Sequence, residues 1–250
     1  MALDDPDMDA YGPGSRPRPV VRFDAIGEGW QLFKARAGTW ILTGLVVLVC
    51  TGMIESLVAR FTHQRLPAGG GGFRLAVPPA GRVLAYLITS VISGFFLGGM
   101  FRMACLQVRG QAIRVGDLFG VTDAKVCREL LIGILACAAA LFVAMWFCVV
   151  PVFIIAGLLM FTLPLIVDGR LDAATALRTS WNALKGQWLT VTIFHFVLNI
   201  LSGMGVCLCG VGLLFTMPLY CLSIAVLYRD FFLTRNAGLH TKPLAPDPDF

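Results

Sequence analysis

The chain has 250 residues, of which 57% are hydrophobic and 14% are charged, and its mean hydropathy is +0.79. Soluble globular domains carry about 25% charged residues, so this composition excludes an ordinary soluble domain and places the chain among membrane proteins. The net charge of +5 does not indicate a nucleic-acid partner, because membrane proteins use basic residues to set topology and to contact anionic headgroups.

The N-terminal segment, residues 1–19, is expected to be a disordered cytoplasmic tail. Its first ten residues hold four Asp and neither Lys nor Arg, the opposite of the basic start of a secretory signal peptide. We therefore expect no cleaved signal, and the first apolar helix is expected to act as an uncleaved insertion signal.

Two stretches of the chain, Leu130–Val167 and Gly186–Tyr228, contain no Asp, Glu, Lys or Arg. A bilayer core about 30 Å thick is crossed by about 20 helical residues, so each stretch is long enough for two spans. Pro151 marks the expected break in the first stretch, because proline cannot continue the helical hydrogen-bond ladder. With two earlier apolar segments, the sequence predicts an all-α, polytopic membrane domain over residues 20–235 with six transmembrane helices. The predicted spans are Trp40–Ala59, Val83–Phe101, Leu130–Val150, Pro151–Val167, Trp188–Val206 and Val211–Tyr228.

The distribution of Lys and Arg predicts the orientation of these spans. Of the 20 basic residues, 16 fall on the side that holds both termini and four on the other side. Cytoplasmic loops carry the excess of Lys and Arg, so both termini are expected to be cytoplasmic. The loop 61–81, which contains the run Gly69–Gly72, is then external and flexible, and residues 236–250 form a second disordered cytoplasmic tail.

A short segment of mixed polarity precedes each pair of spans. The sequence predicts three hairpins, each preceded by a cytoplasmic amphipathic helix that lies in the membrane interface with tryptophan at headgroup depth. The expected anchors are Trp30, Trp40, Trp181 and Trp188. The apolar positions in the first and third segments are Phe23, Ile26, Trp30 and Phe33, and Leu171, Ala174, Trp181, Leu184 and Trp188.

Short matches between these segments suggest an internal repeat. Trp30–Lys34 aligns with Trp181–Lys185, and Phe161–Leu165 aligns with Phe215–Leu219. We interpret the chain as three parallel copies of one unit, although any hairpin protein with basic inner loops looks partly repetitive.

Polar side chains form a stripe along the fifth span, at Thr192, His195, Asn199 and Ser202. Ionisable or polar residues inside a span are the usual pointers to function, so one interpretation is a proton or substrate relay built on His195. The interpretation that we favour is a set of interhelical hydrogen bonds that fix packing, because no intramembrane carboxylate accompanies the histidine. In either case the stripe is expected to face another helix or a cavity.

Small residues recur every four positions on the second span, at Ser90, Gly94 and Gly98. This spacing lets helix backbones approach closely, and we favour packing inside the protein over a homodimer face. Pro164 and Pro218 predict kinks in the fourth and sixth spans. Asp168, at the end of the fourth span, is expected to cap the segment that follows it.

The sequence contains no catalytic constellation: it lacks a phosphate-binding glycine loop, an HExxH motif and a GxSxG motif. We therefore expect no catalytic residues, cofactor or metal. The eight cysteines are interpreted as small packing residues. Cys207 and Cys209 form the one close pair, and a redox role for that pair is an open alternative.

Several short motifs resemble a known group of proteins. These are Gly29–Lys34, Phe161–Asp168, the pattern Ala176…Ser180…Lys185…Trp188, and Cys209–Pro218. The chain resembles poorly characterised bacterial integral membrane proteins that are similar to the membrane domain of glycerophosphoryl diester phosphodiesterases. The resemblance implies a six-helix fold in the cytoplasmic membrane of a bacterium. It implies no catalytic residues, since no phosphodiesterase domain accompanies these spans.

Two functions remain as hypotheses at this point. The leading one is a non-enzymatic membrane scaffold or accessory module, whose cytoplasmic interfacial helices contact lipid or a protein partner. The alternative is a small transporter or channel that uses the His195 and Asn199 stripe as a homo-oligomer. The expected partners are therefore the lipid bilayer and a membrane protein or second copy, with no nucleic acid.

Overall fold

The computed structural model describes residues 19–62, 80–120, 123–147, 149–207 and 211–233. These residues form helices joined by short connections, without a β-strand among them. Six of the helical segments are long and apolar enough to cross a membrane, which confirms the prediction of an all-α, multi-pass membrane protein. Both expected tails, apart from Pro19, and residues 63–79 of the expected loop 61–81 lie outside the described residues, whereas 61–62 and 80–81 belong to helices. The six segments are Ala37–Val58, Leu87–Val108, Ala124–Trp146, Val150–Val167, Ala173–Gly205 and Leu213–Leu233.

Consecutive helices contact each other in pairs. These pairs are α2 (Ala37–Thr62) with α3 (Ala80–Val108), α4 (Ala124–Phe147) with α5 (Val149–Leu158), and α8 (Trp188–Cys207) with α9 (Leu213–Tyr228). A short helix, α6 (Thr162–Val167), continues the fourth span after a break. The connecting elements are α1 (Asp24–Ala35), η2 (Val115–Phe119), α7 (Ala173–Leu184), η3 (Lys185–Gln187) and η4 (Arg229–Leu233).

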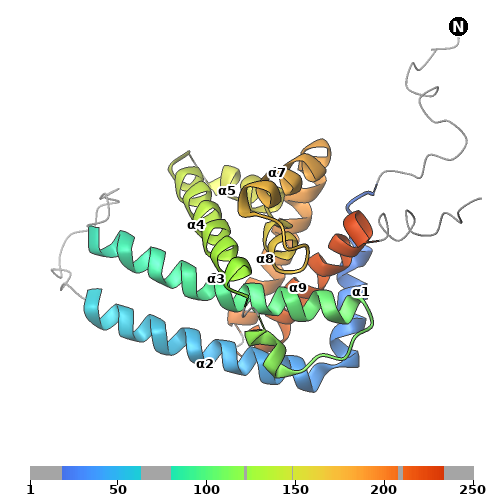
Figure 1. The fold of residues 1–250 in the computed structure, drawn as a ribbon, viewed down its shortest axis with the longest axis horizontal. Helices are drawn as coiled ribbons and strands as arrows, with labels where there is room; N and C mark the ends of the chain where they lie inside the picture. Colours follow the sequence, from blue (N-terminus) through green and yellow to red (C-terminus); the bar gives the residue numbers. More distant parts are fainter. Residues whose placement is uncertain (1–18, 63–79, 121–122, 148, 208–210, 234–250) are drawn as a thin grey trace, which may run out of the picture.

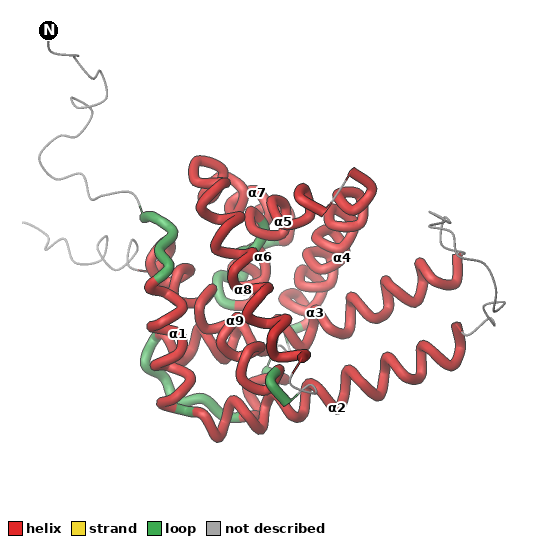
Figure 2. Tube along the Cα trace, turned by 180° about the vertical axis from the view of Figure 1, so that it is seen from behind, coloured by secondary structure: helices red, strands yellow, loops and turns green. Residues whose placement is uncertain are grey.

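The helix α9 lies at the centre of the bundle. It contacts α1, α2, α3 and α8, and its last ten residues are buried except for Tyr220, which is half-buried. Figures 1 and 2 show α2 and α3 side by side, with their far parts projecting away from the other helices. Exposed large apolar residues follow one face of α2 and one face of α8, as expected for helix faces that contact lipid. They are Leu42, Leu45, Val49, Met53 and Leu57 on α2, and Leu189, Ile193, Phe196 and Ile200 on α8.

The ion pairs of the described residues gather at one end of the bundle, which we call the polar end. Here α3, α6 and α9 end, and α1, α4, α7 and α8 begin. Hydrogen bonds and ion pairs between these helix ends confirm that they lie together, for example Arg109 with Asp168 and Asp123 with Arg170. The paired charges therefore lie at an end where water or headgroups can solvate them, whereas Glu55 is exposed towards the other end of α2.

The fourth span is interrupted at residues 159–161. Pro164 lies in the first turn of α6, and it lacks the N–H that would otherwise bond to the carbonyl of Met160. The helix is therefore broken just before Pro164, whereas α9 continues through Pro218. Pro151 marks the break expected between the third and fourth spans in the same way, because α4 ends at Phe147 and α5 begins at Val149. It is the third residue of α5, where its missing N–H has no intrahelical partner to lose.

The helix α1 is packed into the bundle rather than lying free on a membrane surface. It runs antiparallel to α9, because Glu28 pairs with Arg229 while Phe33 contacts Phe215 with 5.9 Å between the ring centroids. Between these contacts Gly29 lies against Ser223, and a Cβ at Gly29 would be 3.0 Å from the Ser223 hydroxyl. The buried face of α1 is Ala25, Gly29 and Phe33. Of the four expected apolar positions, Phe33 belongs to this buried face, whereas Phe23 and Trp30 are exposed at 45% and 40%.

Candidate functional site at the polar end

Side chains from the ends of α3 and α6 and from the start of α4 surround a cavity of about 190 Å³ at the polar end. Three of the lining residues are arginines and two are aspartates, and the remaining walls are apolar or glycine. The lining consists of Arg102, Leu106, Arg109, Gly120, Asp123, Val126, Val167, Asp168 and Arg170. A second cavity of about 160 Å³ adjoins it and shares Asp123, Val126 and Arg170.

Local backbone geometry brings two of these arginines to the cavity. The helix α3 ends in a Schellman motif, in which Gly110 has φ of +76° and the N–H of Gln111 donates to the carbonyl of Leu106. This turn places Arg109 at the helix end. Arg170 follows α6 and has φ of +52°, in the left-handed region that a side chain with a Cβ rarely adopts. This conformation belongs to a second, Schellman-like turn, in which the N–H of Leu171 donates to the carbonyl of Leu165 at 3.2 Å.

The charges in the cavity are unequally paired. Arg109 donates a hydrogen bond to Asp168, which also accepts one from the Tyr228 hydroxyl at 3.0 Å. Arg170 and Asp123 form a looser pair, with 3.5 Å between nitrogen and oxygen and with both side chains half exposed or more. Arg102 has no ion pair with any described residue. Its guanidinium fits beside Gly120, where an added Cβ would lie 2.7 Å from Arg102 Nη1.

The sequence suggested that Asp168 caps the segment after the fourth span, but Asp168 does not cap α7. It instead joins α3 to α9 through Arg109 and Tyr228. The first N–H of α7, from Ala173, donates to Glu129 Oε2 at 3.1 Å. Because Glu129 lies on α4, this contact fixes α7 against a different helix and satisfies a helix N-terminus with a negative charge.

A network of four charged residues joins α1 to the end of α9. Arg22 pairs with Asp230 at 2.7 Å and with Glu28 at 3.0 Å, and Arg229 contacts both acids. The hydrogen bond from Arg229 lowers the pKa of the Glu28 carboxyl below its ordinary value, and the hydrogen bond to Asp230 raises the pKa of the Arg22 guanidinium. This network therefore fixes the start of α1 against the end of α9.

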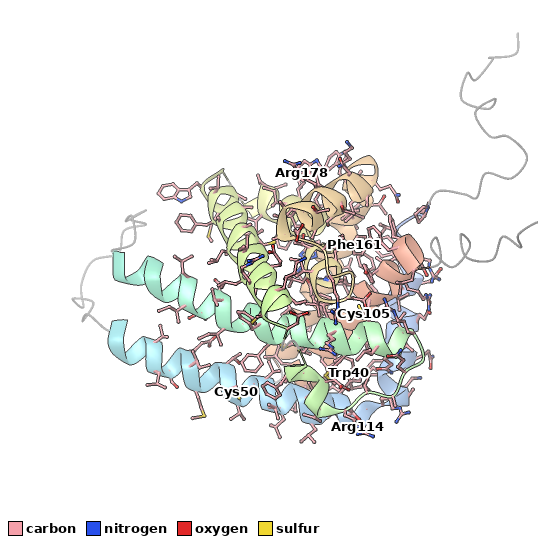
Figure 3. All side chains as sticks on the ribbon, in the orientation of Figure 1. Trp40, Cys50, Cys105, Arg114, Phe161 and Arg178 are labelled. Carbon is pink, nitrogen blue, oxygen red and sulfur yellow. The ribbon has the colours of Figure 1, made fainter. Side chains whose placement is uncertain are left out.

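Trp40 is not a membrane-interface anchor. Its side chain is fully buried between α2 and α3, and its indole N–H donates to Gln107 Oε1 at 2.6 Å (Figure 3). The Gln107 amide in turn donates to the carbonyl of Leu32 at 2.6 Å. Trp40 and Gln107 thus connect α1, α2 and α3. The other three expected anchors, Trp30, Trp181 and Trp188, are exposed at 40%, 45% and 49%.

Ser180 of α7 occupies the break in the fourth span. Its hydroxyl donates to the carbonyl of Leu158 at 2.7 Å and accepts from the N–H of Phe161 at 3.3 Å. Ser180 is fully buried, and Phe161 is packed among aromatic rings near the end of α9 (Figure 3). One side chain therefore satisfies two backbone groups that the broken helix leaves without helical partners.

The polar residues of the fifth span do not form one continuous polar path in the structure. His195 is buried and its ring lies against Tyr220 of α9, with 6.0 Å between centroids, whereas Asn199 is exposed. Thr192 and Asn199 bond to carbonyls of their own helix, at Trp188 and His195. Ser202 is half-buried. Among the described residues, neither cavity reaches this stripe, and Asn199 faces the surface instead of the interior that was expected.

Replacing His195 by leucine is expected to leave the protein folded and as stable as the wild type, or slightly more stable. The Nδ1 atom of His195 is buried without a hydrogen-bond partner among the described residues, and an apolar side chain removes that unsatisfied group. Thermal unfolding of the purified variant in detergent measures this. A marked loss of stability, or loss of a transport activity by a folded variant, would show that His195 has a role that its contacts do not explain.

The small residues of the second span lie against α4. A Cβ at Gly94 would be 2.7 Å from the Ile134 side chain, and a Cβ at Gly98 would be 3.0 Å from Leu130. Ser90 is half-buried. The close approach therefore brings α3 and α4 together within the chain.

Five cysteines whose side chains are described, Cys50, Cys105, Cys127, Cys137 and Cys221, are free thiols. Cys105 and Cys221 are buried between α3 and α9, and Figure 3 shows Cys105 there. Side chains at Cys207 and Cys209 lie outside the described residues. Within the described part of the chain, His, Cys, Asp and Glu side chains form no group with the geometry of a metal site.

Sequence reasoning missed the cavity, Gln107, Glu129 and Ser180. It counted Arg102, Arg109 and Arg170 only as topology signals, because their convergence depends on how the ends of α3 and α6 pack. One signal was available: Arg102 falls six residues inside a candidate span, where an unpaired charge is unfavourable and therefore informative.

Comparisons of this chain with models of known protein families, with characterised proteins and with solved structures found no match, so the functional argument rests on the geometry described above.

Proposed function

We propose that this chain is a non-enzymatic scaffold or accessory module of a bacterial cytoplasmic membrane, with both termini and the polar end in the cytoplasm. Three exposed tryptophans on helices that are packed into the bundle carry this proposal. Trp30 on α1, Trp181 on α7 and Trp188 at the start of α8 are exposed, although each helix is fixed in the bundle by its opposite face. Tryptophan favours the boundary between apolar and wet surroundings, so these side chains are suited to headgroups or a protein partner.

The contacts of the connecting elements support the proposed threefold repeat. In this interpretation each unit consists of a connecting helix and two spans. The connecting helix packs on the last span of the preceding unit: α1 packs on α9, η2 on α3, and α7 on α6. The first span of each unit does the same, since α2 contacts α9, α4 contacts α3 and α8 contacts α5. Three hairpins related by a repeat would give this cyclic pattern.

Replacing Trp30 and Trp181 together by alanine is expected to weaken association with the partner or membrane surface that the module engages. The test is purification of the tagged protein in mild detergent, followed by mass spectrometry of the proteins and lipids that accompany it. A stoichiometric protein partner in the wild type, reduced several-fold in the double variant, supports the accessory role.

Trp146→Ala is the matched control, because Trp146 is 57% exposed near the opposite end of α4. Equal loss of the partner in the control and the double variant would contradict a specific role for the polar end. A clean oligomer that carries only lipid or a small molecule would contradict the accessory role and favour transport through the fifth span.

A further inference from the structure

We propose that the cavity lined by Arg102, Arg109 and Arg170 binds a phosphate group, either as the headgroup of an anionic lipid or as a free phosphate. This inference goes beyond the proposed function, because it concerns a small-anion site that is independent of any protein partner. The three arginines come from two helix ends that are far apart in the sequence, and the fold brings them around one space.

The charge balance of the cavity favours an anion. Three arginines face two aspartates, which leaves one positive charge in excess, and the two acids contact Arg109 and Arg170. Arg102 is the arginine without an acidic partner among the described residues. An anion in the cavity would therefore neutralise the excess charge without displacing the existing ion pairs.

The position of Arg102 makes a guanidinium without a partner unfavourable. Arg102 lies six residues before the end of the span Leu87–Val108, which corresponds to about 9 Å along the helix. A charged residue inside a span is retained where it meets a specific partner, and here the described chain does not supply one.

The chemistry of the lining suits a phosphate group. Guanidinium groups are planar forks that bind phosphate and carboxylate oxygens in pairs, and several arginines can engage one tetrahedral phosphate together. The volume of about 190 Å³ is below the range of about 300–1,000 Å³ typical of pockets for drug-sized ligands. The cavity therefore suits a phosphate with a few attached carbons, which Leu106, Val126 and Val167 could contact.

The backbone around the cavity positions two of its arginines. Arg170 is the one described residue other than glycine with a positive φ, and that conformation places it at the cavity. Gly120 supplies room for the Arg102 guanidinium, since a Cβ there would overlap it. Both helix ends therefore bring an arginine to the cavity through their own capping geometry, without any need for a ligand to fold them.

Binding is tested with the full-length purified protein by titration at constant ionic strength set with chloride. One arm uses inorganic phosphate on the protein in neutral detergent. The other uses nanodiscs of phosphatidylcholine with and without phosphatidic acid. We expect Arg102→Gln to weaken phosphate affinity by about tenfold or more, because a charge-assisted hydrogen bond in the site is lost.

Arg178→Gln is the control, because Arg178 is an exposed arginine on α7 outside the cavity (Figure 3). Arg170→Gln is the second cavity variant, and since Arg170 is 73% exposed it is expected to fold if Arg102→Gln does not. The proposal is supported if the wild type binds free phosphate, phosphatidic acid or both, and if both cavity variants weaken that binding. Which of the two forms binds then identifies the source of the phosphate group. Equal binding by the cavity variants and the control variant would overturn the proposal. It would also be overturned if the wild type neither binds free phosphate nor prefers nanodiscs that contain phosphatidic acid.

Discussion

The variant Ser180→Ala is expected to lower the free energy of unfolding by about 2–5 kcal/mol, because the carbonyl of Leu158 and the N–H of Phe161 both lose their partner in a dry interior. Alanine fits the same space but offers no hydrogen bond, and water has little access to a residue that is fully buried. Thermal unfolding in detergent measures the loss, with a maleimide dye that reports exposure of the buried thiols of Cys105 and Cys221.

Ser223→Ala is the matched control for this experiment. Ser223 is also fully buried, but its hydroxyl donates only to the carbonyl of Leu219 in its own helix. That carbonyl lies inside α9, where it can keep a helical backbone partner, so the control is expected to change stability by less than about 1 kcal/mol. Equal stability of the two variants would show that the Ser180 hydroxyl does not hold the break of the fourth span together.

The variant Gly99→Ala is expected to destabilise the protein and to disturb the cavity wall. An added Cβ would lie 2.2 Å from the carbonyl oxygen of Leu118, which is a backbone atom of η2 and cannot rotate away. The segment η2 must therefore move, and it leads directly into Gly120 at the cavity. Overpacking of this kind typically lowers stability by about 1–3 kcal/mol.

Gly52→Ala serves as the control for Gly99→Ala. Gly52 is exposed on α2, and an added Cβ would meet no atom within 4 Å. Because alanine favours a helix over glycine, this change is expected to be neutral or slightly stabilising. The unfolding temperatures of the two variants are measured side by side. If Gly99→Ala unfolds at the same temperature as Gly52→Ala, η2 is not packed against α3 as described.

The positions of the spans could be predicted from the sequence because hydropathy and length alone determine them. The charge-free stretches Leu130–Val167 and Gly186–Tyr228 each correspond to two described segments that can cross a membrane. The break before Pro164 was also predictable, because the missing N–H is a property of the residue itself. Its capping by Ser180 was not, because a serine nineteen residues away carries no local signal of that contact.

The faces of the connecting helices could not be predicted from periodicity. A helix in a membrane protein has apolar residues on the side that meets lipid and on the side that meets protein, so hydrophobicity does not distinguish them. On α1 the small residues Ala25 and Gly29 face the bundle and Trp30 faces outward. Trp40, in contrast, faces the interior, because Gln107 provides its indole N–H with a buried acceptor.

The arginine cavity could not be predicted, because an arginine that sets topology and an arginine that lines a site look the same in the sequence. Basic residues near the ends of spans follow the positive-inside rule whether or not they converge. Arg102, Arg109 and Arg170 become a site only where α3 and α6 end side by side, and that arrangement depends on the packing of the whole bundle.

The orientation of the polar end is the central claim, since the accessory surface and the phosphate site are both proposed to face the cytoplasm. The most direct measurement is epitope accessibility in intact cells, with one tag inserted at Gly69–Gly72 and others at the two termini. We predict that antibodies reach the inserted tag in intact cells and reach the terminal tags only after the membrane is permeabilised. Terminal tags that are accessible in intact cells, with an inserted tag that is protected, would contradict the account.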